Sequence, residues 1–551
     1  MRPPPNWVRV TEASSAAPAS SGDRTEGRRA GWLRPATAVG SGIFLSRITG
    51  FARDIAVAAF LGTNLLADAY FAAIKIPNII RNLLGEGTLS AAFVPVYSEA
   101  LERDGANAPA PARLATSVLG LVLTAALFLS ALGVILAPWI TDAVMVGADD
   151  ETRRITTELV RILFPMSGTL IVGAWFLGVL NSHGKFFLPF VAPTLWNLSQ
   201  IAGLLLAHAL GSEKLAHALA WSALVGSLLQ VGIQLPAARR LVGTLRPSGG
   251  WSWEPVRRVA RNTVPVISSQ GIFQISTLVD ISLATLVGTS AMSALGYSQR
   301  LMYLPISLFG ISVAAAALPD MSREATVARL RPRLVNGFFQ ILFFVLPAAV
   351  CFLVFGDLIV RLAFERRAFT ETSTLIVAAV LGTYALGLVA SASQKLFASG
   401  FHALQDTRTP MIIAAVAVTV GIGLAVTFTL LARAGLPTEY RPYAAMGIAL
   451  GGACGAWINL LLLWTLLGRR LGGLFDRRAL RAAVRLAGAA GLAGLTAALV
   501  RSGLASRWPA TGFLANLGLL LLLMACGAVP YLLIARRPPV ILPQEEAGLE
   551  R

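Results

Sequence analysis

Seven charged side chains crowd two apolar stretches near the start of the chain, where membrane helices rarely carry charge. They are Arg47, Arg53, Asp54, Asp68, Lys75, Arg81 and Glu86. A charge at the centre of a membrane helix costs about 2.5–3.5 kcal/mol, so such residues face a bundle interior or a water-filled cavity. Arg47 and Asp54 are two helical turns apart and share one helix face, as do Asp68 and Lys75. The spacing predicts one wall of a polar, mostly cationic transport cavity.

An eighth charged residue, Arg300 in YSQRLMYLP (297–305), lies in the second half of the chain. Guanidinium groups stay charged and hold phosphate oxygens with paired hydrogen bonds, so arginines that converge on one cavity predict an anionic ligand. The competing interpretation is that some arginines extend to the membrane interface or neutralise nearby acids.

An isolated carboxylate, Asp280, stands in FQISTLVDISLATL (273–286). Both usual fates of an intramembrane acid stay open for it: it binds a coupling cation or proton, or it pairs with a basic group across the cavity.

The composition identifies the elements that must position these residues. Of 551 residues, 55% are hydrophobic and only 13% are charged, whereas soluble proteins carry about 25% charged residues. The net charge of +18 lies in clusters between apolar spans, as the positive-inside rule requires, and therefore does not indicate a nucleic-acid partner. The three cysteines and four histidines are scattered, which argues against structural disulfides and a metal site. No nucleotide-binding loop or nucleophile–base motif is found, so we expect a transporter rather than an enzyme.

Hydropathy predicts an all-α polytopic membrane protein with about fourteen spans of roughly 20 residues or more. They lie near 36–62, 65–98, 114–139, 154–183, 188–210, 215–236, 262–288, 291–321, 333–356, 371–402, 409–432, 443–467, 479–500 and 510–535. Residues 1–33 read as a disordered cytoplasmic tail, because they hold no apolar run. The arginine-rich segments 237–261 and 469–485 then face the cytoplasm, as does the short tail 536–551, and the acidic loop 140–153 faces outward. Both termini are expected in the cytoplasm, although three arginines in 361–367 fall on the outer side.

An internal repeat predicts two lobes. AAFVPVYSEA (91–100) ends the second span and AAALPDMSREA (315–325) ends the eighth. Repeats offset by six spans share one orientation, which implies lobes related by an axis along the membrane normal, with substrate bound between them near the midplane. We therefore expect an N-lobe at 34–236 and a C-lobe at 262–467, with the last two spans, within 468–535, outside the repeat.

Several motifs resemble the MurJ/MviN family, the lipid II flippases of the MOP exporter superfamily. They are SRITGFARD (46–54), DAYFAAIKIPNIIRNLLGEGTLSAAFVPVYSE (68–99), APTLWN (192–197), RLMYLP (300–305), FERRAFT (364–370) and ALQDTRTP (403–410). The resemblance runs from about residue 36 to 535. It implies a V of two six-helix lobes, plus two C-terminal helices that form a groove for the polyprenyl tail within 468–535.

The resemblance also assigns roles. Arg47, Arg53 and Asp54 match cavity residues of the first helix. Asp68, Arg81 and Glu86 match those of the second, and Arg300 matches the arginine of the second lobe. These residues would engage the pyrophosphate of lipid II or exchange ion-pair partners during gating. Asp280 matches a position that helps to bind sodium in some members. The chain departs there, because AVAVTVGIGLAVTF (415–428) lacks the Asn and Asp that complete such a site. Tyr303 also replaces a glutamate often found three residues after the arginine.

The resemblance implies a flippase of the bacterial cytoplasmic membrane that moves lipid II, an undecaprenyl-pyrophosphate-linked disaccharide peptide, from the inner to the outer leaflet by alternating access. No cofactor is expected. The membrane potential or a coupled cation supplies the driving force, with sodium left without its full ligand set. Membrane lipids and the division or elongation machinery are the expected partners.

Three alternatives stay open. Another MOP-type transporter would carry a different lipid-linked oligosaccharide or a drug, and a drug exporter would favour acidic and aromatic cavity residues for cationic substrates. A polytopic glycosyltransferase would present a catalytic carboxylate in a large outer loop. A scaffold without transport would have no use for buried charges.

Overall fold

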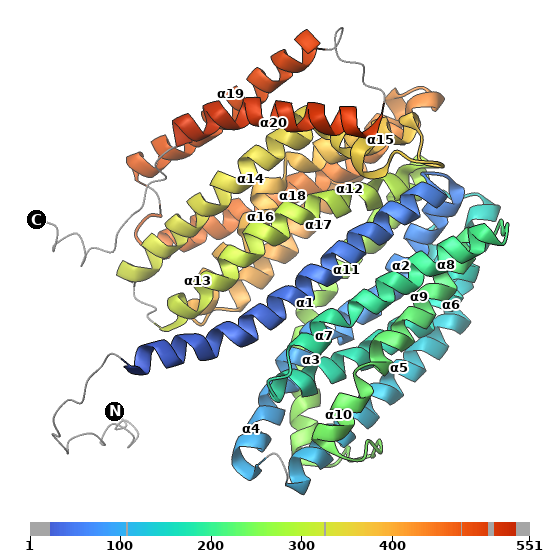
Figure 1. Cartoon of the computed structure of the whole chain (residues 1–551), viewed down its shortest axis with the longest axis vertical. Coiled ribbons are helices and arrows are strands. Elements are labelled where there is room, and N and C mark those ends of the chain that lie inside the picture. Colours follow the sequence, from blue (N-terminus) through green and yellow to red (C-terminus); the bar gives the residue numbers. More distant parts are fainter. Residues whose placement is uncertain (1–22, 106–107, 324–326, 475, 505–511, 536–551) are drawn as a thin grey trace, which may run out of the picture.

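The computed structural model describes residues 23–105, 108–323, 327–474, 476–504 and 512–535, and all the regular structure in these ranges is helical (Figure 1). The side chains of residues 23–38 and of a few later positions, among them Glu86, lie outside the described part. The predicted fold class, an all-α polytopic membrane protein, is confirmed.

The apolar spans are fewer than expected when length and composition alone are counted. Among the described residues, ten helices could cross a membrane, or twelve if two bent helix pairs are each one span. These pairs bend by 45° between Ser268 and Phe273 and by 42° between Ala385 and Leu388. Two further predicted spans, 36–62 and 65–98, form helices that this count omits. These two helices carry several charged residues each, which lowers their mean hydropathy below that of the ten to twelve counted spans. The predicted number of fourteen spans is therefore not confirmed by this count.

The N-lobe contains the first ten helices. They are α1 (Asp23–Leu61), α2 (Leu65–Leu84), α3 (Glu86–Ala92), α4 (Val94–Asp104), α5 (Pro109–Val144), α6 (Asp150–Ser182), α7 (Phe187–Val191), α8 (Pro193–Ala209), α9 (Leu215–Gly232) and α10 (Leu235–Val242).

The C-lobe and a C-terminal hairpin follow. The C-lobe holds α11 (Glu254–Val287), α12 (Ala291–Pro305), the π-helix η1 (Ile306–Ile311), α13 (Ser312–Arg323), α14 (Val327–Phe364), α15 (Glu371–Ala385), α16 (Leu388–Ala403), α17 (Arg408–Gly435), the 3₁₀-helix η2 (Thr438–Ala444) and α18 (Ala445–Arg470). The hairpin consists of α19 (Arg477–Leu504) and α20 (Phe513–Ala535).

Three predicted boundaries differ from the structure. The span 65–98 is broken at Gly85, whose N–H bonds the carbonyl of Arg81, and the chain continues as the short helices α3 and α4. The tail predicted to reach residue 33 is helical from Asp23, and residues 1–22 lie outside the described part, as do residues 536–551. The predicted basic loop 237–261 is shorter, because α10 extends to Val242 and α11 begins at Glu254.

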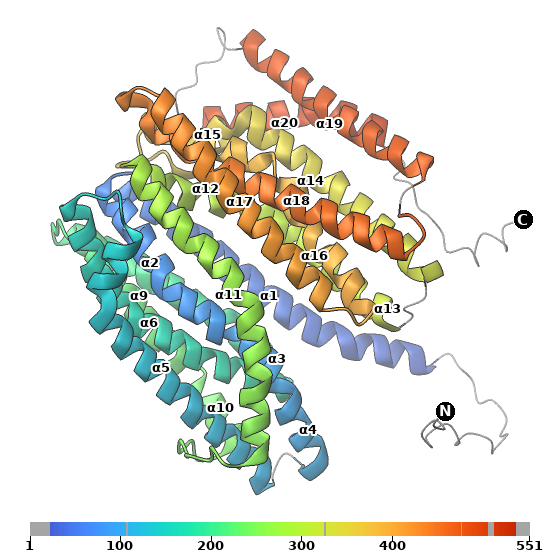
Figure 2. The ribbon, with the colours of Figure 1, turned by 180° about the vertical axis from the view of Figure 1, so that it is seen from behind.

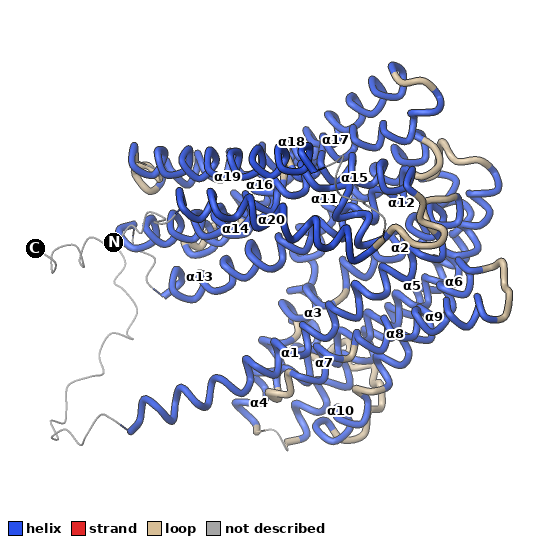
Figure 3. Tube along the Cα trace, turned by 45° about the horizontal axis from the view of Figure 1, so that its top comes forward, coloured by secondary structure: helices blue, strands red, loops and turns tan. Residues whose placement is uncertain are grey.

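The two lobes meet at one end and diverge toward the end that carries both chain termini (Figures 2 and 3). We call the first end the closed end; it includes the loops at 62–64, 145–149, 288–290 and 365–370. One hydrophobic core crosses between the lobes there. Tyr297 of α12 lies 4.9 Å from Phe71 of α2 and 5.4 Å from Phe369, measured between ring centroids. Edge-to-face contacts of this kind strengthen packing beyond the area that they bury.

The C-terminal hairpin packs on α14 of the C-lobe. Arg501 of α19 donates to Oδ1 of Asp357 at 2.9 Å and to the carbonyl of Val354 at 3.0 Å. The Tyr531 hydroxyl of α20 donates to the carbonyl of Phe343 at 2.6 Å. The hairpin is thus attached to α14 at two separate levels.

Close packing of α17 on α18 depends on glycine and yields a stability prediction. A Cβ atom on Gly451 would overlap the backbone of Ala425, whereas one on Gly423 would meet nothing within 4 Å. We expect Gly451→Ala to lower the free energy of unfolding by about 1–3 kcal/mol, the usual cost of overpacking. Gly423→Ala, the matched control, should be neutral or stabilising, because alanine favours helix by about 1 kcal/mol. Thermal unfolding of the purified proteins compares them, and equal melting temperatures would contradict this packing.

Candidate functional site

Arg53 of α1 is held inside the N-lobe rather than presented to a cavity. Its side chain is buried and donates to Oδ1 of Asp54 at 2.7 Å and to Oδ1 of Asn197 at 3.0 Å. Its guanidinium also stacks 4.9 Å from the ring centroid of Trp196. The amide nitrogen of Asn197 in turn donates to the carbonyl of Ser46. The motif APTLWN therefore contributes the two side chains of α8 that hold Arg53 between α1 and α8.

Asp54 carries this arrangement across to the other lobe. Its second oxygen, Oδ2, lies 3.6 Å from Nε of Arg300 on α12. Asp54 therefore stands between one arginine of each lobe, with Arg53 buried and the Arg300 side chain 37% exposed. Arg47 lies two helical turns before Asp54 on α1, is exposed, and donates to the Ser307 hydroxyl of η1 at 2.6 Å. Two of the predicted arginines, Arg47 and Arg300, are thus accessible enough to meet a ligand.

Asp68 serves at the closed end as a helix cap between lobes. Its carboxylate accepts from the backbone N–H of Ser290 at 2.6 Å and of Ser293 at 2.7 Å, at the N-terminus of α12. The first N–H groups of a helix have no partner within the helix, and the helix dipole favours a negative charge beside them. Asp68 is buried, so these hydrogen bonds are shielded from water. This predicted cavity residue instead fastens α2 to α12.

Further hydrogen bonds join the lobes beside this cap. The hydroxyls of Thr63 and Ser373 are 2.7 Å apart, and the Tyr297 hydroxyl donates to the carbonyl of Gly62 at 3.0 Å. The N–H of Ala368, in the motif FERRAFT, donates to the carbonyl of Ala59 at 3.0 Å. Gly62 has φ +59° and a Cβ there would overlap the carbonyl of Ala368, so the contact requires glycine.

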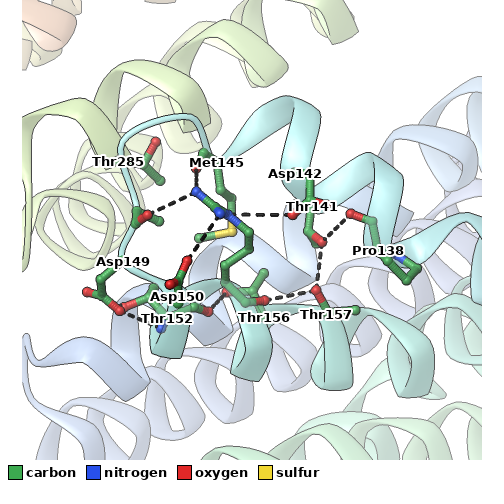
Figure 4. A network of polar contacts seen from close by, with 12 residues as sticks. Pro138, Thr141, Asp142, Met145, Asp149, Asp150, Thr152, Thr156, Thr157 and Thr285 are labelled. Atoms are coloured by element: carbon green, nitrogen blue, oxygen red, sulfur yellow. Dashed lines mark hydrogen bonds and ion pairs between the residues drawn. The ribbon is translucent and has the colours of Figure 1, made fainter.

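The α5–α6 loop completes the closed end (Figure 4). Asp149 caps α6, because its carboxylate accepts from the N–H of Thr152 at 2.7 Å, and this bond lowers the pKa of Asp149. Arg153 donates to the carbonyl of Ala148 at 3.1 Å and holds the loop in place. The N–H of Gly147 then reaches the Thr285 hydroxyl of α11 at 3.4 Å. The loop is therefore held by hydrogen bonds of its own and contacts the C-lobe through Gly147.

Lys75 and Asp280 act on each other electrostatically across the lobes, one from α2 and the other from α11. No hydrogen bond or ion pair within 4.0 Å joins them to each other or to any other residue that the structure describes. Arg81 lies further along α2, within the same helix that carries Asp68 and Lys75. Glu86 begins α3, and its side chain lies outside the described part.

The motif ALQDTRTP forms a compact turn between α16 and α17. Asp406 accepts from the Thr409 hydroxyl at 2.6 Å and from the N–H of Thr409 at 3.0 Å, and Arg470 lies 2.7 Å away. These interactions, the Thr409 hydroxyl first, lower the pKa of Asp406 to about 2. The motif thus shapes a loop and lies apart from the arginines.

Several functional positions escaped the sequence analysis. Asn197 and Trp196 were noticed only as part of a motif, and Ser290, Ser293 and Ser307 were not singled out. The segment GTS (288–290) ahead of an apolar run is a helix-start signal, and it could have indicated that a cap was needed there. Nothing in the sequence indicates that the capping carboxylate comes from Asp68, over two hundred residues earlier.

If the Asp68 cap holds the two lobes together, its removal should make the closed end open more often. We expect Asp68→Ala to increase the rate at which an impermeant maleimide modifies a cysteine placed at the buried Thr63, by roughly tenfold. Hydrogen bonds to a charged group contribute about 1.5–3 kcal/mol, and 1.4 kcal/mol corresponds to a tenfold change in equilibrium. Glu151→Ala, an exposed acid at the same end, is the control. Equal labelling rates in both variants would show that the cap does not hold the lobes together.

The amino-acid sequence is similar to those of known lipid II flippases. A family model described as lipid II flippase MurJ matches residues 57–519. The probable lipid II flippase MurJ of Rhizobium meliloti (strain 1021) is 34% identical over 440 residues, which cover 78% of this chain and 79% of that protein. The lipid II flippase MurJ of Burkholderia cenocepacia is 31% identical over 459 residues, 81% of this chain and 86% of its own length.

Solved structures show the same fold. A structure of lipid II flippase MurJ in an inward closed conformation aligns with a TM-score of 0.73 at 24% identity, over 91% of this chain and 99% of that one. An inward-facing multidrug resistance MATE transporter of the MOP superfamily aligns with a TM-score of 0.62 at 15% identity, over 78% and 94% of the two chains.

Proposed function

Because this chain belongs to the lipid II flippase MurJ family, we propose that it moves lipid II from the inner to the outer leaflet of the cytoplasmic membrane by alternating access of its two lobes. The observation that carries this proposal is Asp54, placed between Arg53 of the N-lobe and Arg300 of the C-lobe. A diphosphate that approaches Arg300 offers it a better partner than a carboxylate 3.6 Å away, since guanidinium binds phosphate through two hydrogen bonds at once.

The conformation of the structure is consistent with the first half of a transport cycle, in which the head group is taken up. The closed end is fastened by the Asp68 cap and the Thr63–Ser373 contact, while Arg47 and Arg300 are reachable from the other end. With both termini in the cytoplasm, this is the conformation that would receive the head group from inside. Binding at Arg300 would release Asp54 and weaken the bridge between the lobes, and the lobes would then rock about α11.

The direction follows from charge. A net anionic head group that moves outward is favoured by a potential negative inside, by about 2.3 kcal/mol per charge per 100 mV. Asp280 is our candidate for a coupling cation or proton. Replacing it with asparagine tests coupling: if the dependence of transport on sodium and pH is unchanged, Asp280 has no part in it.

The rival transport functions differ from this one in their ligand. The fold shared with the MATE transporter does not separate them, because it shows architecture only. The accessible arginines favour an anionic, lipid-linked substrate over a cationic drug. Interaction with the division or elongation machinery stays a prediction that these contacts do not address.

The decisive experiment measures lipid II on the outer face of cells that have been depleted of their own flippase and express this chain. A membrane-impermeant reagent that modifies only externally exposed lipid II provides the readout. We expect exposure to return to the level before depletion. Normal membrane amounts of the protein without renewed exposure would refute lipid II as the substrate and favour another lipid-linked glycan.

A further inference from the structure

A second polar region lies inside the C-lobe, apart from the arginines. It is a cavity of about 640 Å³ between α11, α12, α16, α17 and α18, within the usual range of about 300–1,000 Å³ for small-ligand sites. Its polar lining includes Asp280, Gln299, Tyr303, Gln394, Lys395 and Asn459, and no arginine is among the described residues that line it. The cavity is therefore not another site for the diphosphate.

Asn459 of α18 provides an amide group that a ligand in this cavity could bind. The residue is 7% exposed, lines the cavity, and makes no hydrogen bond with any residue in the described ranges. The amide atoms of Asn459 are not fully enclosed by protein, so they are open to the cavity and available to a ligand. Gln394 of α16 uses its amide nitrogen on the carbonyl of Ala456 at 3.2 Å, which leaves its oxygen for a ligand.

Two opposite charges also line this cavity. Lys395 of α16 is exposed, and it forms no ion pair with the part of the chain that the structure describes. Asp280 of α11 is half-buried and forms no ion pair within 4.0 Å with any described residue, although the charge of Lys75 on α2 acts on it from further away. A ligand that brings a carboxylate to Lys395 and an amine to Asp280 would satisfy both.

The position of the cavity relative to Arg300 links it to the head group. Gln299 and Tyr303 of α12 line the cavity and flank Arg300 in the same helix. A head group with its diphosphate at Arg300 would therefore have other parts of its length close to this cavity. Amide side chains and a pair of opposite charges complement a peptide, whose backbone supplies donors and acceptors and whose ends and side chains supply carboxylates and amines.

We propose that the C-lobe cavity receives the peptide portion of the lipid-linked head group, with a peptide carboxylate bound by Lys395, backbone amides bound by Asn459 and Gln394, and an amine bound by Asp280. This inference rests on the proposed function. It makes the C-lobe the part of the protein that recognises the peptide, while the arginines recognise the diphosphate.

The test compares two ligands on the purified full-length protein: lipid II and the same lipid-linked disaccharide diphosphate without its peptide. We expect Lys395→Gln and Asn459→Leu each to weaken binding of lipid II about tenfold and to leave binding of the peptide-free ligand unchanged, because only the first ligand reaches the cavity. Arg300→Ala should weaken both ligands. Lys214→Gln, an exposed lysine in the loop before α9, is the charge-matched control and should change neither.

The outcomes separate the two proposals. If the Lys395 and Asn459 variants bind lipid II as well as the wild type does, or weaken both ligands equally, the cavity does not hold the peptide, and the flippase proposal stands on Arg300 alone. If the wild type binds neither ligand, the proposed function fails and this inference fails with it. The role of Asp280 is tested by measuring lipid II binding of the wild type and of Asp280→Asn, first in sodium and then with sodium replaced by a bulky organic cation. This comparison shows whether the carboxylate binds the peptide amine or an ion. A loss that appears only in sodium would assign it to the ion and remove the amine contact from the proposal.

Discussion

Replacing Arg300 with alanine is expected to abolish the appearance of lipid II on the outer face while the protein reaches the membrane in normal amounts. Arg300 is a partly exposed arginine of the C-lobe and pairs with Asp54 of the N-lobe at 3.6 Å. Its loss removes a charge-assisted contact to the diphosphate together with the bridge that binding would break. Hydrogen bonds to charged groups contribute about 1.5–3 kcal/mol, so we expect the rate of exposure to fall by roughly 10- to 100-fold.

Two variants control this result. Arg433→Ala removes a half-buried arginine from the last turn of α17 that forms no ion pair within the described chain, and it should leave exposure of lipid II unchanged. Arg300→Lys keeps the charge but loses the planar fork, so it should rescue only in part. Full activity of Arg300→Ala would exclude Arg300 from substrate binding. Equal loss in Arg433→Ala would indicate that the assay reports folding rather than the site.

A disulfide across the closed end is expected to stop transport reversibly. The hydroxyl oxygens of Thr63 and Ser373 lie 2.7 Å apart on opposite lobes, close enough that cysteines at both positions could form a bond of about 2.05 Å with small adjustment. Alternating access requires these residues to separate. The Thr63→Cys/Ser373→Cys protein should therefore be inactive when oxidised and should regain its activity when a reductant is added.

The single-cysteine variants supply the control, since each should be active under both conditions. The native thiols Cys351, Cys454 and Cys526 are half-buried and stay in place in every variant. The same assay of lipid II exposure gives the readout, and gel mobility after protease cleavage between the lobes reports cross-linking. Undiminished transport by the fully cross-linked protein would rule out opening at this end.

Hydropathy and charge predicted much of the architecture. Apolar runs located most of the helices, because a bilayer demands long uninterrupted segments. The internal repeat indicated two lobes, and the helices do gather into two groups that diverge from the closed end (Figure 3); that the lobes are related by a repeat stays a prediction. The break at Gly85 and the bent helix α11 were missed, since window averages do not register a local change of direction.

The site was predictable in part, and the reason differs between residues. Intramembrane charges must have a use, so Arg300 and Asp54 could be recognised as important from the sequence alone. Their division of labour could not. Arg53 is enclosed by Trp196 and Asn197, and Asp68 caps a helix that begins more than two hundred residues later. Lys395 drew no attention because a single lysine in the last third of the predicted span 371–402 resembles many interfacial lysines until the cavity beside it is seen.

The attachment of the C-terminal hairpin has a mechanical consequence. Because α19 and α20 are fixed to α14 at two levels, through Arg501 and Tyr531, they form part of one rigid body with the C-lobe. If a lipid tail lies along this hairpin, as the family resemblance predicts, we expect it to keep the same protein neighbours and to move with the C-lobe during transport. The relative motion is then confined to the head group and the N-lobe, and the surrounding lipid has only to accommodate a tilt.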